Sequence, residues 1–191
     1  MRTTYLSRLF ASIHMKSCIS ASCIFLTVLL SACSMKDSKQ TLEELLAEYK
    51  EYSMRQYPEG ATYDGDHRYD DKLSDYSEKA IKGRFDSIRV FLEQANDISL
   101  SDLQGEDSLS LILFRKELNQ QLESEQFNLH YMPLTQQDGI HIGFPQIIEY
   151  HPFKTVEDYE HYISRLNAFP KQVNDVIDNM KKGMKAKIVS P

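Results

Sequence analysis

The helical character of this chain is clearest in the segment Leu109-Ser-Leu-Ile-Leu-Phe-Arg-Lys-Glu-Leu-Asn-Gln-Gln-Leu122. Its apolar residues recur every three or four positions, which is the repeat of a helix that buries one side, whereas a half-buried strand alternates every second residue. The repeat predicts a long helix from about 101 to 126. Leu111 and Phe114 widen its apolar side, which indicates contact with more than one neighbouring element. The main stripe is expected to consist of Leu109, Ile112, Leu113, Leu118 and Leu122.

The same repeat predicts two helices upstream. The first runs from about 41 to 57 and ends at the Pro58 that follows it. Thr41 and Glu44 have the spacing of a capping box at its start. The second helix runs from about 77 to 95.

A further helix is expected to follow a cap at Thr155. Pro170 should break or kink it, because proline lacks a backbone donor and its ring clashes with the preceding turn. A last amphipathic segment then runs to Gly183. The apolar side of the first part is expected to comprise Tyr159, Tyr162, Ile163, Leu166 and Phe169.

Residues 131–153 lose the helical repeat and are predicted to form an irregular loop or a short β pair. Long loops inside compact domains often carry function, so Gln136, Asp138 and His141 are candidates for facing a cleft. The alternative is structural: Asp138 and Gly139 form a turn, and His141 binds a backbone carbonyl. The residues that interrupt the repeat are Pro133, Gly139, Gly143, Pro145 and Pro152.

Acidic residues crowd the stretch 64–71, which has too many turn formers for a buried element. They suggest calcium, but an EF-hand loop needs glycine at its sixth position and glutamate at its twelfth, and this stretch has neither. His67 beside Asp66 would suit a metal ion. Helix caps and surface ion pairs explain such clusters more often, so we expect no metal site here.

The N-terminal residues are predicted to be a bacterial lipoprotein signal. Three cationic residues and no acid precede an apolar run that is about a dozen residues long, too short for the ~20 of a membrane-spanning helix. The run ends in Leu30-Ser31-Ala32-Cys33, which resembles the lipobox that directs lipid attachment to its cysteine. The alternative is an uncleaved N-terminal helix in which Cys33 has no special role. Since serine follows Cys33, we expect the periplasmic face of the outer membrane in the cell envelope.

Composition excludes several functional classes. Removal of residues 1–32 takes away three of the 22 basic residues and none of the 28 acidic ones, so the mature chain carries a net charge of -9. Nucleic acid is therefore not an expected partner. All three cysteines lie at or before Cys33, which excludes a disulfide framework or a thiolate zinc site in the folded part. No metalloprotease, nucleophile-elbow or phosphate-loop motif occurs in the chain.

Three segments together resemble the N-terminal region of the domain-of-unknown-function 885 family. They are Gly65–Asp71, Met132–Pro145, and Phe153–Glu160 followed by Arg165–Pro170. The resemblance covers about residues 41 to 191 and implies a largely helical bacterial lipoprotein similar to zinc metallopeptidases. The family's histidine-glutamate zinc motif lies far downstream, and no position here matches it. No catalytic residue, no metal ligand and no cofactor is therefore assigned to this chain, and zinc is implied only for the full-length protein.

The expected fold class is mainly α, a helical bundle that is part of a larger α-helical fold. The predicted organisation is a signal peptide at 1–32, a lipid-anchored tether at 33–40 and the helical N-terminal portion of a larger domain at 41–191. The expected partners are the membrane, through lipidated Cys33, the missing C-terminal catalytic portion and a peptide substrate. The main hypothesis is thus the N-terminal part of a metal-dependent peptidase-like hydrolase, inactive alone. The alternative is a non-catalytic lipoprotein that binds ligands or acts as a scaffold.

Overall fold

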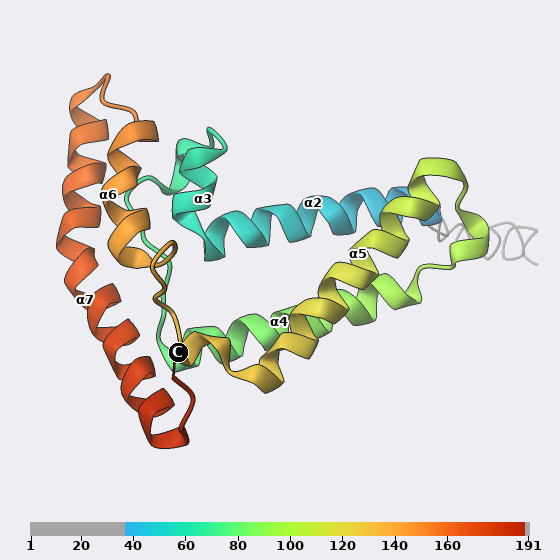
Figure 1. The fold of residues 1–191 in the computed structure, drawn as a ribbon. Coiled ribbons are helices and arrows are strands. Elements are labelled where there is room, and N and C mark those ends of the chain that lie inside the picture. Colours follow the sequence, from blue (N-terminus) through green and yellow to red (C-terminus); the bar gives the residue numbers. More distant parts are fainter. Residues whose placement is uncertain (1–36, 190–191) are drawn as a thin grey trace, which may run out of the picture. The chain divides into compact units, whose positions relative to one another are not determined.

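The computed structural model describes residues 37–189. The chain divides into two units, Met1–Asp37 and Ser38–Pro191, and every described helix belongs to the second. Within the described residues there are α-helices and short 3-10 helices but no strand, which confirms the mainly α fold class. The α-helices in Figure 1 are α2 (Ser38–Gln56), α3 (Pro58–Tyr63), α4 (Glu78–Asp97), α5 (Gly105–Ser124), α6 (Ile140–Tyr150) and α7 (Val156–Ala186). The 3-10 helices are η1 (His67–Tyr69), η2 (Leu100–Asp102), η3 (Glu125–Phe127) and η4 (Leu129–Tyr131).

Helices α2, α4 and α5 pack around an apolar core. Tyr49 of α2 meets Phe91 of α4 and Phe114 of α5 edge-to-face, with ring centroids 5.1 and 5.0 Å apart. Full burial of one such side chain contributes about 1.5–3 kcal/mol, so this core is the main apolar contribution to stability. Its buried members are Leu42, Leu45, Ile88, Phe91, Ala95, Ile98, Leu103, Leu111, Phe114 and Leu118.

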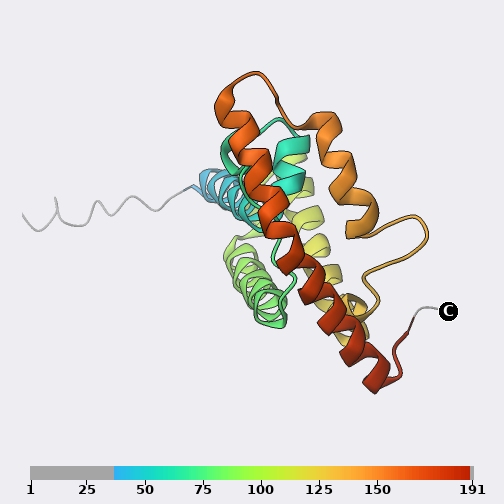
Figure 2. The same cartoon turned by 90° about the vertical axis from the view of Figure 1, so that its left-hand side faces the viewer.

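A second group of elements consists of α3, η1, α6 and α7. Helices α6 and α7 lie side by side in Figures 1 and 2, and the rings of Phe144 and Phe169 stack between them with centroids 3.8 Å apart. Helix α3 contacts both η1 and α6. Near its C-terminal end, α7 meets η4 at Gly183, where a Cβ would lie 2.8 Å from Cβ of Tyr131. The contact of η4 with α7 therefore requires glycine at this position.

The prediction of an irregular segment at 131–153 is wrong for about half of these residues, because α6 occupies Ile140–Tyr150. Proline at position 145 removes only one helical hydrogen bond, and two contacts outweigh that loss. Ile147 is 1% exposed, and Phe144 stacks on Phe169. Tertiary packing thus overrides the low helix propensity of this segment.

The predicted break at Pro170 is also absent, since α7 is one continuous helix of 31 residues. The start of α7 agrees with the sequence: the Thr155 hydroxyl accepts a hydrogen bond from the Asp158 amide, and the Asp158 carboxylate accepts one from the Thr155 amide. This pair is a capping box. The capping box predicted at Thr41 is wrong, because α2 begins at Ser38 and Thr41 lies inside it.

The buried side of α5 agrees with the prediction in part, whereas that of α7 differs from it. In α5 the buried residues are Leu111, Phe114 and Leu118, whereas Leu109 and Leu113 are more than half exposed. In α7 the buried side is largely polar, and the apolar Tyr159, Ile163 and Leu166 remain 46–53% exposed. The buried residues of α7 are Arg165, Gln172, Val176, Asn179 and Gly183.

The stretch 64–71 also departs from its prediction, because Asp70 is 1% exposed and sits among the second group of elements. Its neighbour η1 is a single 3-10 turn capped by Asp66. The prediction failed because Asp70 has buried hydrogen-bonding partners that local sequence does not reveal.

The predicted lipid-attachment site, Cys33, and the lipobox residues Leu30, Ser31 and Ala32 lie outside the described residues. Among residues 37–189, no helix combines the length and the hydropathy that crossing a bilayer requires.

Candidate functional site

An open cleft of about 870 Å³ lies within the second unit. Side chains from α2, α3, α4, α5 and α6 line it, together with the segments between them. Its volume is in the range of ligand-binding pockets, about 300–1,000 Å³. Its tyrosines are Tyr49, Tyr57, Tyr76 and Tyr150, and its ionisable groups besides tyrosine are Glu59, Arg84, Glu117, His130 and Asp138.

Glu59 anchors one side of the cleft. Its carboxylate accepts hydrogen bonds from the amide and hydroxyl of Ser74, at 3.0 and 2.5 Å, and from the side-chain amide of Gln172 at 3.0 Å. Three donors thus hold Glu59, and the bonds join α3, the segment before α4, and α7. The role of this carboxylate is to fix the wall of the cleft.

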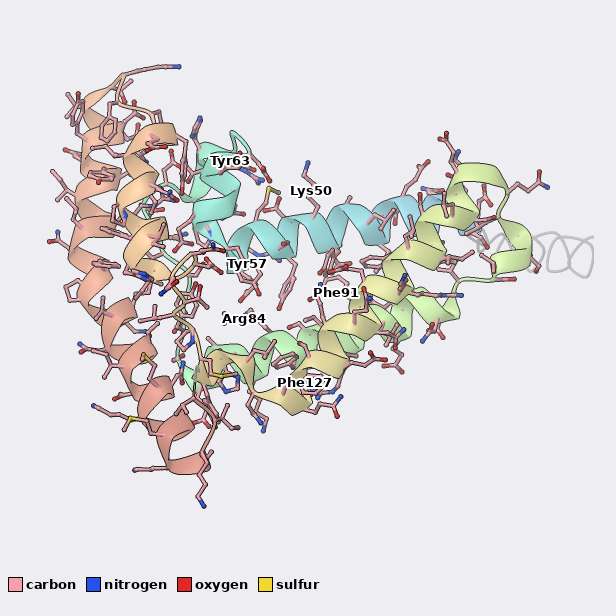
Figure 3. The ribbon with its side chains drawn as sticks, viewed as in Figure 1. Lys50, Tyr57, Tyr63, Arg84, Phe91 and Phe127 are labelled. Atoms are coloured by element: carbon pink, nitrogen blue, oxygen red, sulfur yellow. The ribbon has the colours of Figure 1, made fainter. Side chains whose placement is uncertain are left out.

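Arg84 of α4 is the cation of the cleft. Its Nη1 donates to the carbonyl of Asp75 at 2.8 Å, and its guanidinium carbon lies 5.6 Å from the ring centroid of Tyr57. Figure 3 shows Tyr57 and Arg84 on facing sides of the space between α2 and α4. Within residues 37–189 no carboxylate oxygen lies within 4.0 Å of its guanidinium nitrogens. Arg84 is therefore a half-buried cation without an ion-pair partner in this part of the chain.

Tyr49, Tyr76, Tyr150 and His130 add polar groups that are uncharged at neutral pH to the cleft wall. Burial raises the pKa values of Tyr49, Tyr76 and Tyr150 above the ordinary value for tyrosine. Burial lowers the pKa of His130, against a smaller opposing effect of Glu78. These groups therefore offer hydrogen bonds rather than charge to a ligand.

Behind the cleft, Arg165 of α7 is fully buried and joins the second group of elements. Its Nε donates to the Lys72 carbonyl at 2.8 Å, and its Nη2 donates to the Thr62 hydroxyl at 2.6 Å and the Tyr69 carbonyl at 3.2 Å. The Thr62 hydroxyl donates in turn to the carboxylate of Asp70 at 2.5 Å. We call these bonds the Arg165 network. The Asp70 carboxylate is 4.0 Å from Arg165, so the charges compensate in a dry environment.

His151 belongs to the same network. Its Nδ1 lies 3.4 Å from Nη1 of Arg165, and its Nε2 lies 2.8 Å from the carbonyl of Asp158. Because arginine can only donate, Nδ1 accepts and Nε2 carries the proton that the carbonyl accepts. The imidazole therefore has both nitrogens engaged and is structural.

The sequence-predicted cleft residues fall in different places. Asp138 is among the residues that line the cleft, whereas Gln136 and His141 are not. Asp138 also shapes the local turn: its amide donates to the Thr135 hydroxyl at 2.9 Å, and its carbonyl accepts from the Thr135 amide at 2.8 Å. Gly139 follows with φ of +136°, a conformation that side chains disfavour. The predicted turn at Asp138 and Gly139 is therefore present.

The acidic stretch at 64–71 is used for ion pairs and a cap. Asp66 accepts from the Arg68 amide and pairs with its guanidinium at 2.6 Å, while Nδ1 of His67 lies 2.9 Å from Asp70. Arg68 lowers the pKa of Asp66 to about 2. Among residues 37–189 no group of three histidine, cysteine, aspartate or glutamate residues is arranged to hold a metal ion.

Sequence reasoning missed Arg84 and Tyr57, the pair that gives the cleft its chemistry. Tyr57 stands directly before Pro58 and was expected only to end a helix. Arg84 lies in a predicted helix among ordinary surface charges, and no spacing rule links the two positions. Only the packing of α2 and α4 brings them together.

The chain matches a known protein family. A family model described as a bacterial protein of unknown function (DUF885) matches residues 58–191, which is more than half of the chain. The matched region contains Arg84, Glu59, the Arg165 network and the turn at Asp138. A search among curated proteins finds no match.

Proposed function

Because this chain belongs to the DUF885 family of bacterial proteins, we propose that it is a lipid-anchored envelope protein whose helical unit binds peptide-like substrates for a peptidase-like hydrolase. The observation that carries the proposal is the open cleft, with an unpaired guanidinium and several phenols on its wall. Peptides offer carbonyls, amides and terminal charges, and these match the donors and acceptors present.

The anchor rests on the N-terminal sequence. A charged start, a short apolar run and Leu30-Ser31-Ala32-Cys33 together are typical of exported lipoproteins. Each buried methylene of an acyl chain contributes about 0.8 kcal/mol, so two or more chains on Cys33 would hold the protein on a membrane. The serine after Cys33 favours the periplasmic face of the outer membrane.

The zinc that the family resemblance implies does not fit the described residues. The histidine and carboxylate that come closest together near the acidic stretch, His67 and Asp70, have no third ligand group beside them. Asp70 also belongs to the Arg165 network. We therefore assign binding, and no catalytic step, to residues 37–189.

The anchor is tested by labelling cells with radioactive palmitate. The unchanged chain should incorporate the label and sediment with membranes, because the thiol of Cys33 is the only acceptor of a diacylglycerol thioether in a lipobox. Cys33→Ser should lose both the label and the membrane fraction, whereas Cys23→Ser should keep both. An equally membrane-bound Cys33→Ser protein would disprove the anchor.

The binding role is tested with the full chain in detergent micelles and a fluorescently labelled tetrapeptide, Phe-Ala-Phe-Ala. Ser53 lines the cleft from α2, so Ser53→Trp should fill part of it and weaken binding at least tenfold. Lys50 projects from α2 on the side away from Tyr57 and Arg84 in Figure 3, and Lys50→Trp is the matched control. Equal binding by both variants would place the peptide outside the cleft.

A further inference from the structure

We propose that Arg84 receives the free C-terminal carboxylate of the bound peptide, so that the cleft selects peptide ends over internal peptide segments. This inference deepens the proposed function and rests on it, since it assumes that peptides enter the cleft. It makes Arg84 on the cleft wall a specificity-determining residue for a ligand carboxylate.

The first argument is the unused hydrogen-bonding capacity of Arg84. A guanidinium has five N–H donors in a rigid fork that matches a carboxylate. Within residues 37–189, the only hydrogen bond of this side chain goes from Nη1 to the Asp75 carbonyl. The remaining donors are free to bind two oxygens of a ligand side by side, the geometry in which arginine recognises carboxylates.

The second argument is that Arg84 differs from the other arginines of residues 37–189 that are at least partly exposed. Arg55, Arg68 and Arg89 each lie within 4.0 Å of a carboxylate. Arg115 has no such carboxylate, but its guanidinium donates to the carbonyls of Ala95 and Ile98. Arg84 alone among these combines a position on the cleft wall with an open fork.

The acids of the cleft do not satisfy this cation. The Glu59 carboxylate is held by Ser74 and Gln172, and Glu117 accepts from Gln121 at 2.8 Å. Asp138 accepts from the Gly139 amide at 2.8 Å. All three line the same cleft, yet none lies within 4.0 Å of Arg84 among the ion pairs of this unit. A ligand carboxylate would therefore meet Arg84 without displacing an internal partner.

The surroundings of Arg84 favour a peptide end over a free inorganic anion. The Tyr57 ring lies 5.6 Å from the guanidinium carbon and is 49% exposed, so it offers an apolar face to the last side chain of a peptide. Apolar Phe85, Ile140 and Phe144 also line the cleft. The cleft thus places a cationic side chain and an aromatic ring side by side within its lining.

The experiment compares the labelled tetrapeptide Phe-Ala-Phe-Ala, which has a free carboxylate, with its C-terminal amide, using fluorescence anisotropy on the full chain in micelles. The unchanged protein should bind the acid at least tenfold more tightly than the amide, because a charge-assisted bond pair is lost with the amide. Arg84→Gln should abolish this preference and leave the amide affinity within twofold. Arg84→Lys should keep only part of the preference, since lysine lacks the fork.

Arg89→Gln is the matched control, because it removes one positive charge from the same helix at an exposed position outside the cleft. It should keep the full preference for the acid.

Equal affinities of the unchanged protein for acid and amide would overturn the role of Arg84 while leaving peptide binding in place. Absence of binding by either peptide would overturn the proposed function and this inference together. Circular dichroism melting of each variant separates loss of binding from loss of folding, and a preference that survives in folded Arg84→Gln refutes the assignment.

Discussion

In the group formed by α2, α4 and α5, apolar side chains make the buried contacts. In the group formed by α3, η1, α6 and α7, hydrogen bonds join the elements through the buried guanidinium of Arg165. Apolar contacts have no preferred direction, and their contribution scales with the buried area. Hydrogen bonds to a buried charge require each partner at one distance and angle, and an unmade bond is costly. Substitutions in the first group should therefore lower the free energy of unfolding in proportion to the apolar area that is lost. In the second group, loss of one member should cause a large drop in the free energy of unfolding.

The largest effect is expected for Arg165→Met. Loss of the guanidinium removes the buried cation that faces the Asp70 carboxylate. It also leaves the carbonyl of Lys72 without its donor. Breaking a buried pair in this way costs about 3–5 kcal/mol. Urea denaturation measures the free energy of unfolding. The control Arg89→Met, at an exposed ion pair, should cost about 1 kcal/mol or less, and equal losses in the two variants would contradict the comparison.

The next effect tests the apolar group. Leu118 of α5 is 0% exposed, and Leu118→Ala leaves a cavity that should cost about 3 kcal/mol. Leu113 of the same helix is 53% exposed, and Leu113→Ala should change stability by about 0.5 kcal/mol or less. The same denaturation experiment measures both. A larger loss of stability for Leu113→Ala than for Leu118→Ala would contradict the burial of Leu118 and the exposure of Leu113.

A smaller change in the free energy of unfolding is expected at the helix starts of the two groups. The capping box of Thr155 and Asp158 begins α7, whereas α5 begins after Gln104 without a side-chain cap. Thr155→Ala should lower the free energy of unfolding by about 1 kcal/mol. Gln104→Ala is the matched control and should leave it nearly unchanged, since no cap is lost. Thermal melting followed by circular dichroism at 222 nm measures the difference. Equal shifts of the melting temperature in the two variants would show that the cap does not stabilise the protein.

The smallest effect concerns the exposed ion pair of Asp66 and Arg68 beside the Arg165 network. The Asp66 pKa of about 2 lies below the ordinary 3.8, so the pair stabilises the folded state above pH 3.8. That contribution falls as the pH drops from 3.8 through about 2, where Asp66 becomes protonated in the folded state. Carbon-detected NMR titration of the Asp66 carboxyl measures the pKa, and Arg68→Gln should return it toward 3.8. A pKa near 3.8 in the unchanged protein would show that the pair does not form in solution.

The same contrast explains what sequence could and could not predict. Helical repeats placed α4, α5 and the start of α7 to within a few residues, because apolar periodicity and capping are local signals. Helix α6 was missed because proline and glycine lower local propensity, while the burial of Ile147 that outweighs them depends on distant residues. Pro170 was overrated for the same reason.

The candidate site was less predictable than the fold. Asp138 lies in a glycine turn within a long aperiodic segment, which is a signal that the sequence itself shows. Arg84 and Arg165 look alike in sequence, because both are arginines within helices. Only packing makes Arg84 an open donor on the cleft wall and Arg165 a buried donor. Asp70 and Arg165 lie in two of the segments that carry the family resemblance, and the Arg165 network joins these two segments in space.

Arg165 binds the main-chain oxygen of Lys72 and leaves the Lys72 side chain exposed. This contact depends on the main-chain oxygen of residue 72, which every amino acid has. It does not depend on the side chain at that position. In a library of variants, substitutions at this position should therefore be common among survivors. Codon deletions between Asp70 and Lys72 should be eliminated, because they shift the oxygen out of reach by the length of a residue, about 3.8 Å.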